Sequence, residues 1–202
     1  VAQHTFALLF YILEKLNYYD NYVKSGEYAR GKCFSHFAQN FFELDGKTWG
    51  IIGLGAIGRK VAEIAEAFGC HIICYSASGR KYDTSYEQVD FDELLSRSDI
   101  LSVHAPLNQY TENLMTLEAF CKMKKSAIFL NLARGAIVNE ADLYTALTED
   151  AIAGAGLDVL CKEPMDPENP LLKIKDSKKL IITPHIAWAA KETRFRVVDE
   201  VI

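Results

Sequence analysis

The stretch Thr48-Trp49-Gly50-Ile51-Ile52-Gly53-Leu54-Gly55-Ala56-Ile57-Gly58 decides the fold. A short apolar run leads into the pattern Gly-x-Gly-x-x-Gly, and residues 59–68 follow with apolar side chains at helical spacing. A strand, this glycine pattern and a helix in that order are typical of a dinucleotide-binding site. We expect Gly53 to permit a tight turn, Gly55 to let the backbone approach a pyrophosphate, and Gly58 to allow close packing of helix on strand.

Further apolar runs follow the glycine turn at regular intervals. After the first strand, at residues 47–52, five more have the length of buried strands: residues 71–75, 100–104, 127–132, 151–159 and 179–183. Helical patterns separate them, among them residues 91–97, with Asp90 as the expected N-cap, and residues 140–147. This alternation indicates an α/β fold. We therefore expect a Rossmann-type, doubly wound parallel sheet of six strands with helices on both faces.

The N-terminal part of the chain has a different pattern. Residues 1 to about 22 are predicted as one helix that is apolar all round for two turns and then rich in tyrosine. Such a helix must be buried, either on the sheet or on a second subunit. We expect a linking and dimerisation helix and arm over residues 1–46, a dinucleotide-binding domain over 47–188, and the start of a C-terminal helix over 189–202. No capping signal marks either end, which predicts a piece of a longer protein.

Composition and charge argue against several classes of protein. Half of the 202 residues are hydrophobic, and 22 Lys and Arg against 27 Asp and Glu give a net charge of −5. This balance disfavours a general nucleic-acid binder, and no apolar run approaches the roughly 18 residues of a membrane span. The five cysteines are scattered without a Cys-x-x-Cys pair, and the histidines lack metal-ligand spacing. We therefore expect free thiols in a reducing cytoplasm and no metal site.

The turn after the second strand is expected to bind the adenosine ribose. An NAD site usually carries Asp or Glu there, but the position is Ser76, and no carboxylate follows until Asp83. Ser78, Arg80 and Lys81 offer hydroxyl and cationic donors, which suit a 2′-phosphate. We expect NAD(P)H as cofactor, with NADPH preferred over NADH. Two alternatives stay open: the cations point into solvent, or Asp83 folds back onto the ribose.

Several later stretches carry a more specific pattern. They are Val1-Ala2-Gln3-His4-Thr5, Ser102-Val103-His104-Ala105-Pro106-Leu107, Asn131-Leu132-Ala133-Arg134-Gly135, Gly156-Leu157-Asp158-Val159 with Glu163-Pro164, and Thr183-Pro184-His185-Ile186-Ala187-Trp188. Together with the glycine turn, and in this order, they resemble the D-isomer-specific 2-hydroxyacid dehydrogenases. The Ala187-Trp188 pair after His185 is similar to the glycerate dehydrogenase and hydroxypyruvate reductase branch of that family.

The resemblance implies a catalytic set of Arg134, Glu163 and His185. These residue types suit the reduction of a 2-oxo acid, because arginine offers a planar fork to the substrate carboxylate and histidine can protonate the carbonyl oxygen near neutral pH. A carboxylate beside such a histidine favours the imidazolium. Each of the three residues follows a predicted strand, and ligands of open α/β sheets bind at the carboxyl ends of strands.

The resemblance also implies further cofactor contacts. Asp158 is expected to hold the nicotinamide carboxamide. The other implied residues are Ala56 and Ile57 at the pyrophosphate turn, His104, Ala105, Pro106 and Thr111 on the adenosine and ribose side, and Ala133, His185 and Ala187 on the nicotinamide side. A homodimer and a second, substrate domain, largely absent from this chain, are implied as well, which leaves the identity of the 2-hydroxy acid open.

Two functions remain in competition. The first is an enzyme that reduces small 2-oxo acids such as hydroxypyruvate or glyoxylate. The second is a nucleotide-sensing binding protein similar to the C-terminal-binding corepressors, which retain the same Arg, Glu and His. Ala187-Trp188 and the lack of a basic or disordered tail favour the enzyme. The full set of motifs disfavours a purely structural Rossmann domain.

Overall fold

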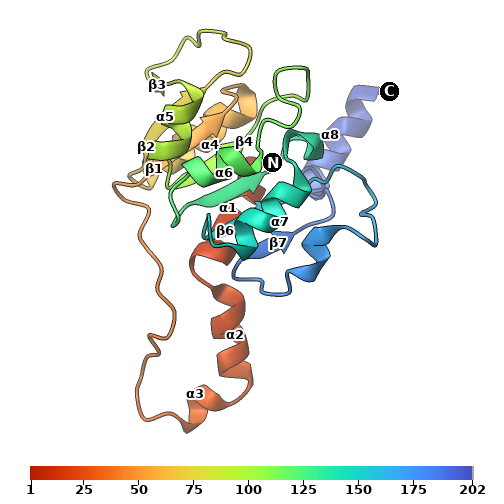
Figure 1. Ribbon diagram of the computed structural model, residues 1–202. Helices are drawn as coiled ribbons and strands as arrows, with labels where there is room; N and C mark the ends of the chain where they lie inside the picture. Colours follow the sequence, from red (N-terminus) through yellow and green to blue (C-terminus); the bar gives the residue numbers. More distant parts are fainter. Residues whose placement is uncertain (202) are drawn as a thin grey trace.

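A seven-stranded parallel sheet forms the centre of the molecule (Figure 1). The computed structural model describes the backbone of residues 1–201 and the side chains of residues 1–196. The strand order is β3-β2-β1-β4-β5-β6-β7, and every neighbouring pair is parallel. The strands are β1 (Thr48–Ile52), β2 (His71–Tyr75), β3 (Glu87–Gln88), β4 (Ile100–Val103), β5 (Ile128–Asn131), β6 (Gly154–Leu157) and β7 (Leu180–Ile182).

The predicted doubly wound sheet is confirmed, with one additional strand. All six predicted strands form, with shorter bounds at several ends. The extra strand is β3, a two-residue edge strand whose Glu87 and Gln88 are both exposed. The chain winds from β1 outward to β2 and β3, then crosses to β4 on the other side of β1. The order therefore reverses between β1 and β4, and ligands of such folds bind beside this point at the carboxyl ends of the strands.

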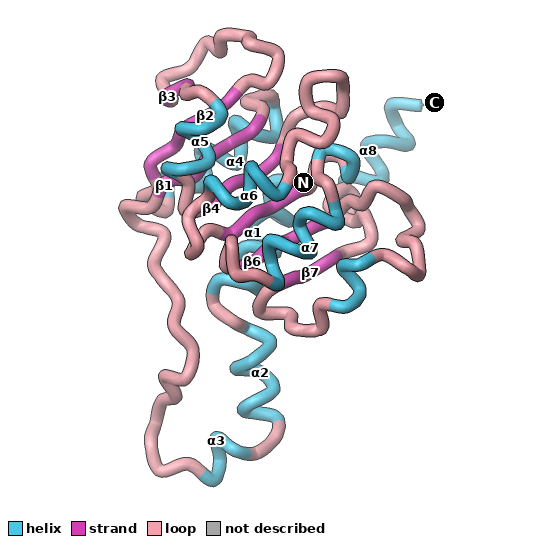
Figure 2. Tube along the Cα trace, in the orientation of Figure 1, coloured by secondary structure: helices cyan, strands magenta, loops and turns pink. Residues whose placement is uncertain are grey.

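Helices cover both faces of the sheet (Figure 2). One face packs on α5 (Phe91–Arg97), α6 (Leu117–Lys122) and α7 (Glu140–Thr148), and the other packs on α1 (Ala2–Leu13) and α4 (Ala56–Ala67). Successive strand residues point to opposite cores, as Ile51 and Ile52 do, because side chains alternate along a strand. Asp90 caps α5 as expected, since its Oδ1 accepts a hydrogen bond of 2.8 Å from the Glu93 N–H. Two short 3₁₀ helices, at Gly135–Ile137 and Pro170–Lys173, and the terminal α8 (Lys191–Val201) complete the fold.

The prediction of one helix over residues 1–22 is wrong. Lys15 adopts a left-handed conformation with φ of 56°, which ends α1 and starts α2 (Leu16–Lys24) in a new direction. Six residues of α1 are buried, whereas α2 buries none. The apolar helix is thus covered by the sheet of its own chain, and only the tyrosine-rich part extends beyond it.

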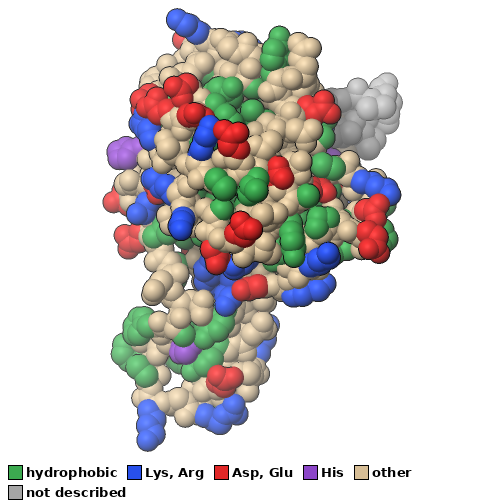
Figure 3. Space-filling model, in the orientation of Figure 1, with side chains coloured by type: hydrophobic (Ala, Val, Ile, Leu, Met, Phe, Trp, Pro, Cys, Tyr) green, Lys and Arg blue, Asp and Glu red, His purple; other side chains and the backbone are tan. Residues whose placement is uncertain are grey.

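An arm projects from the sheet domain (Figure 1). It consists of α2, α3 (Glu27–Arg30) and an extended return segment that leads to β1. Hydrophobic side chains gather on this arm, at the bottom of the view in Figure 3. Phe34, Phe37 and Phe41 are 89%, 82% and 57% exposed. The arm therefore presents apolar surface that the chain itself does not cover.

The described part of the chain offers neither a membrane span nor a metal site. Within residues 1–201, no helix combines the length and the apolar character needed to cross a bilayer. In the same part of the chain, His, Cys, Asp and Glu side chains do not gather into groups suited to a metal ion. All five cysteines are free thiols.

Candidate active site

A cleft runs along the carboxyl ends of the strands. It consists of a cavity of about 690 Å³ beside β5 and β6 and one of about 370 Å³ beside β1 and β2, and both are lined by His104, Ala105 and Pro106. Every predicted cofactor residue except Gly58 lines one of the two. The larger cavity has Ile57, Ala133, Arg134, Asp158, His185 and Ala187; the smaller has Gly53, Gly55, Ala56, Ser76, Ser78, Arg80 and Thr111.

The three glycines of the turn have distinct surroundings. Gly53 has φ of +92°, and an added Cβ would lie 2.7 Å from the Ala105 nitrogen. A Cβ on Gly58 would lie 2.2 Å from the Gly53 carbonyl oxygen, so α4 packs closely on the turn. A Cβ on Gly55 would meet no atom within 4 Å. The space above Gly55 is therefore open to a ligand, at the N-terminus of α4 where free N–H groups favour phosphate.

The smaller cavity ends in polar and cationic side chains. Ser76 is buried, and its Oγ lies 3.4 Å from that of Ser78. Arg59 and Tyr82, which the sequence analysis missed, line the same cavity beside Arg80. Arg59 also donates a 2.9 Å hydrogen bond to the Asp83 carbonyl oxygen, which ties this turn to α4. Lys81 and Asp83 are not among the residues that line the cavity.

His104 presents one unpaired ring nitrogen at the junction of the two cavities. Trp49 Nε1 donates to Ser102 Oγ over 2.8 Å, and Ser102 Oγ lies 3.1 Å from His104 Nε2. Indole only donates, and His104 Nε2 is the one acceptor that the Ser102 hydroxyl contacts among the described residues. A hydroxyl that donates to Nε2 places the proton of the neutral ring on Nδ1. Nδ1 is shielded from solvent and has no partner among the described residues. Burial lowers the pKa of His104 to about 4, so the ring is a neutral donor near pH 7.

His185 lines the larger cavity of the cleft and pairs with Glu163, which lines a neighbouring cavity of about 490 Å³. His185 Nδ1 lies 2.7 Å from Glu163 Oε2, and Glu163 Oε1 accepts a 2.8 Å hydrogen bond from the Leu160 N–H. Burial alone would raise the pKa of Glu163, but the hydrogen bonds from His185 and Leu160, with the nearby charges of His185 and Arg134, lower it below its ordinary value. The carboxylate thus holds Nδ1 and leaves His185 Nε2 free.

Arg134 stands on a turn built by its neighbours. Buried Asn131 accepts from the Ala133 N–H and donates to the Arg134 carbonyl oxygen, both over about 3 Å. Gly135 lies against the backbone of Leu160, where an added Cβ would fall within 2 Å of the Leu160 carbonyl carbon. The exposed Arg134 side chain lines the larger cavity with His185. The Arg-Gly pair therefore brings the arginine turn onto the loop that carries Glu163.

Asp158 has several partners within the chain. Its Oδ1 accepts from Thr183 Oγ1 over 2.5 Å and from the Ile186 N–H over 2.9 Å, and its Oδ2 accepts from the Ala187 N–H over 2.8 Å. The buried carboxylate thus organises the turn that carries His185. The partner that the resemblance implied for Asp158 was a ligand amide.

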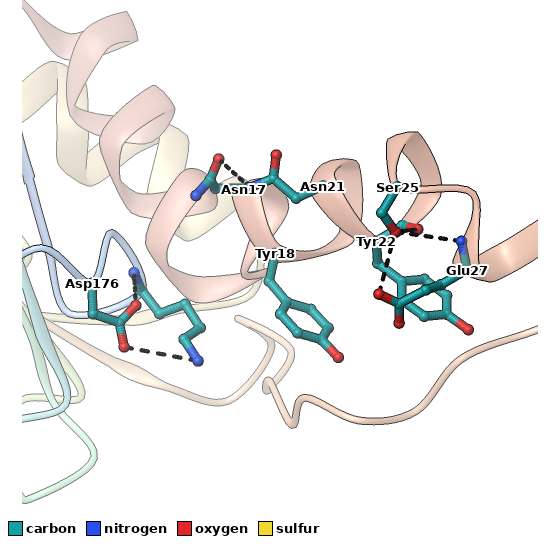
Figure 4. Close-up of a pocket in the computed structure, with 8 residues that line it drawn as sticks. Asn17, Tyr18, Asn21, Tyr22, Ser25, Glu27 and Asp176 are labelled. Carbon is teal, nitrogen blue, oxygen red and sulfur yellow. Dashed lines mark hydrogen bonds and ion pairs between the residues drawn. The ribbon is translucent and has the colours of Figure 1, made fainter.

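A separate hollow lies outside the cleft, between α2 and the loop before β7. Figure 4 shows Tyr18 and Tyr22 from α2, with Asp176 from that loop, around a space of about 350 Å³. None of the predicted site residues lines it. The arm joins the sheet domain beside this hollow, where Asn17 Nδ2 donates to Ser177 Oγ over 2.8 Å.

The match to a family model decides the family. Residues 6–187 match the model described as D-isomer specific 2-hydroxyacid dehydrogenase, NAD binding domain. The chain belongs to the D-isomer-specific 2-hydroxyacid dehydrogenases. The matched range spans the glycine turn, the arginine turn and the loops of Glu163 and His185, so the cleft described above lies within this family's NAD binding domain.

Curated relatives in this dehydrogenase family cover the whole chain. It is 39% identical to a hydroxypyruvate reductase of Blautia hydrogenotrophica over 98% of its length, and 37% identical to a glycerate dehydrogenase of Methylorubrum extorquens over its full length. The chain spans 62% of each of these relatives.

Solved structures share the fold. A D-lactate dehydrogenase of Aquifex aeolicus, complexed with NAD and lactic acid, gives a TM-score of 0.88 at 29% identity, covering 99% of this chain and 63% of that one. An acyclic imino acid reductase in complex with NADPH and D-Arg gives 0.82 at 35% identity, covering 99% and 61%. Both nicotinamide dinucleotides thus occur among its structural neighbours.

Proposed function

We infer that the whole protein is a reductase that transfers hydride from NAD(P)H to a small 2-oxo acid such as hydroxypyruvate or glyoxylate, giving the D-2-hydroxy acid. The single observation that carries this inference is the pair formed by His185 and Glu163, 2.7 Å apart, in which His185 lines the same cavity as Arg134. A cation, an oriented imidazole and an open dinucleotide turn are the parts that carbonyl reduction needs. The names of the curated relatives support the same substrate class.

Each of the three residues, Arg134, His185 and Glu163, has a separate role. Arg134 binds the substrate carboxylate through its guanidinium and sets the position of the neighbouring carbonyl. His185, with Nδ1 held by Glu163, donates a proton from Nε2 to the carbonyl oxygen. Glu163 orients the ring through its contact with Nδ1. When bound, the reduced nicotinamide supplies the hydride.

Features of this chain favour a dinucleotide in the cleft. The open space above Gly55 leaves room for a pyrophosphate, and His104 Nδ1 offers a donor that has no other partner among the described residues. Most of the cofactor-lining residues contribute backbone groups and the shape of the cavity. Asp158 instead holds the His185 turn, and this turn forms the nicotinamide end of the cleft. We extend this to NADPH over NADH, because Arg59, Arg80 and Ser78 line the adenosine end, where no carboxylate repels a 2′-phosphate.

Three properties of the whole protein belong to the same proposal. The arm, with its exposed phenylalanines, contributes to a homodimer. Residues 1–46 act as a linking and dimerisation segment, 47–188 as the cofactor domain, and 189–202 as the start of a helix toward a substrate domain. Five free thiols are consistent with a reducing cytoplasm.

Steady-state kinetics test the proposed activity. The whole protein is assayed with hydroxypyruvate and glyoxylate, using NADPH and NADH in parallel. We expect His185→Ala to lower kcat by at least about 100-fold, since general acid catalysis contributes that much. Arg134→Ala should act mainly on the KM of the oxo acid. The matched control is His71→Ala, at an exposed histidine on the opposite end of β2. Tight dinucleotide binding without turnover would instead support the nucleotide-sensing function.

A further inference from the structure

The N-terminal helix reaches the back of the His185 turn through one histidine. His4, on α1, places Nε2 2.9 Å from Thr183 Oγ1 and 3.4 Å from Asp158 Oδ1. The His4 side chain is 21% exposed and that of Asp158 is fully buried. His4 lies far in sequence from the turn and lines neither of the two cavities that form the cleft. It contacts instead Thr183 and Asp158, which support the turn.

The direction of the hydrogen bonds follows from the chemistry of the three groups. An ionised carboxylate only accepts, so Thr183 donates its hydroxyl hydrogen to Asp158 Oδ1. Thr183 Oγ1 then accepts from His4, which requires a hydrogen on His4 Nε2. The result is a directed series of bonds from α1 to a buried carboxylate, and bonds of this charge-assisted kind are the stronger ones.

The same carboxylate fixes the backbone of the turn. It accepts from the N–H groups of Ile186 and Ala187, the two residues that follow His185. His185 itself has φ of +53°, in the left-handed region that residues with a side chain rarely adopt. Such a conformation persists only where surrounding bonds determine it. The direction of the His185 ring thus depends on Asp158, and the setting of Asp158 depends on His4 and Thr183.

We propose that His4 is a positioning residue for proton transfer by His185, acting through Thr183 and Asp158. The proposal rests on the proposed function, because it assigns His4 to the reaction of the same cleft. His4 does not touch the substrate or the cofactor. Its Nε2–H group donates to Thr183 Oγ1. The His185 turn requires this donor and not the bulk or the polarity of the His4 side chain.

Two variants of nearly equal shape separate the donor from the bulk. His4→Gln keeps an N–H donor near the position of Nε2, whereas His4→Met fills similar space without one. In the whole protein, we expect His4→Met to lower kcat about 10-fold, the effect of losing one hydrogen bond in a network that ends on a charged group, with the KM of the oxo acid within about 2-fold. His4→Gln should restore kcat to within about 2-fold of wild type. His71→Met, at an exposed histidine, is the matched control.

The outcomes are distinct from those of the activity test. If the wild-type protein reduces no 2-oxo acid, the proposed function fails. If it does, and His4→Met retains full kcat, or His4→Gln is impaired as much as His4→Met, the role of His4 is overturned. Should His4→Met not fold, Thr183→Val against Thr183→Ser gives the same comparison, since valine keeps the shape of threonine and loses its hydroxyl. Equal kcat values in that second pair would also overturn the proposal.

Discussion

Gly55 and Gly58 belong to one turn, but a side chain at each would meet different neighbours. Above Gly55 the structure is open, whereas Gly58 is pressed against the Gly53 carbonyl. We predict that Gly55→Val leaves the melting temperature nearly unchanged but weakens NADPH binding by at least about 10-fold, because the side chain enters the pyrophosphate space. Gly58→Val should instead lower the melting temperature through a backbone clash. Calorimetric titration and thermal melts measure both, and unchanged binding by Gly55→Val would contradict the assignment.

His104 makes stability depend on pH. Its folded pKa of about 4 lies below the ordinary value of 6.5, so the unfolded chain binds more protons between these values. This group costs nothing near pH 7; its destabilising effect begins as pH falls through 6.5 and is complete below about 4. At pH 5 it amounts to about 2 kcal/mol. We predict that His104→Gln loses less stability than wild type between pH 7 and pH 5 in urea unfolding. Equal losses would show that the ring is not held neutral.

The sequence could indicate at this scale which site residues lie near one another, for a physical reason. The glycine turn, Arg134, Glu163 and His185 stand in short motifs at strand ends, so order along the chain also gives position in space. Arg59 carries no such signal, because only the packing of α4 turns its side chain toward the adenosine end. The role of Asp158 in holding the His185 turn could not be predicted either, since its partners lie about 25 residues away in the chain.

At the scale of elements, buried strands were predictable and marginal ones were not. Apolar runs marked six strands, whereas β3 has two exposed polar residues and pairs only at the edge. The short helix α6 escaped prediction, although Thr116 caps it by accepting from the Ala119 N–H. The chain breaks between α1 and α2 because Lys15 adopts a left-handed conformation. This break could not be predicted, because no glycine or proline occupies the position.

The packing of α1 on β6 is one of the contacts that join the N-terminal helix to the sheet. Ile12 is fully buried, and a Cβ on Gly154 would lie 2.9 Å from its side chain. The small residues of β6 thus admit the helix closely. We predict that Ile12→Ala lowers the free energy of unfolding by about 2–5 kcal/mol, as large-to-small core changes do. The control Val23→Ala, on exposed α2, should change it by less than about 0.5 kcal/mol. Similar values for the two variants would contradict this packing.

At the scale of the whole molecule, the arm is the feature that we expect to determine assembly. Phe34 and Phe37 are almost fully exposed in a single chain, and contiguous apolar surface of this kind marks interaction sites. We predict that the whole protein is a dimer in light scattering at micromolar concentration. Replacing both phenylalanines by serine should shift it to monomer, while Phe195→Ser on α8 should leave the dimer intact. A monomeric wild-type protein would contradict the role of the arm in dimerisation.

The effect of Glu163→Gln on kcat for oxo-acid reduction tests the central claim, that the Glu163 carboxylate holds the His185 ring for proton transfer, most directly. Stopped-flow or steady-state rates are compared for wild type and Glu163→Gln, which keeps the shape of the side chain and removes its charge. Without the carboxylate, His185 Nδ1 loses a charged hydrogen-bond partner at 2.7 Å. We predict that kcat falls at least about 10-fold in Glu163→Gln, while the KM of the oxo acid stays within about 2-fold of wild type. An unchanged kcat would contradict the claim.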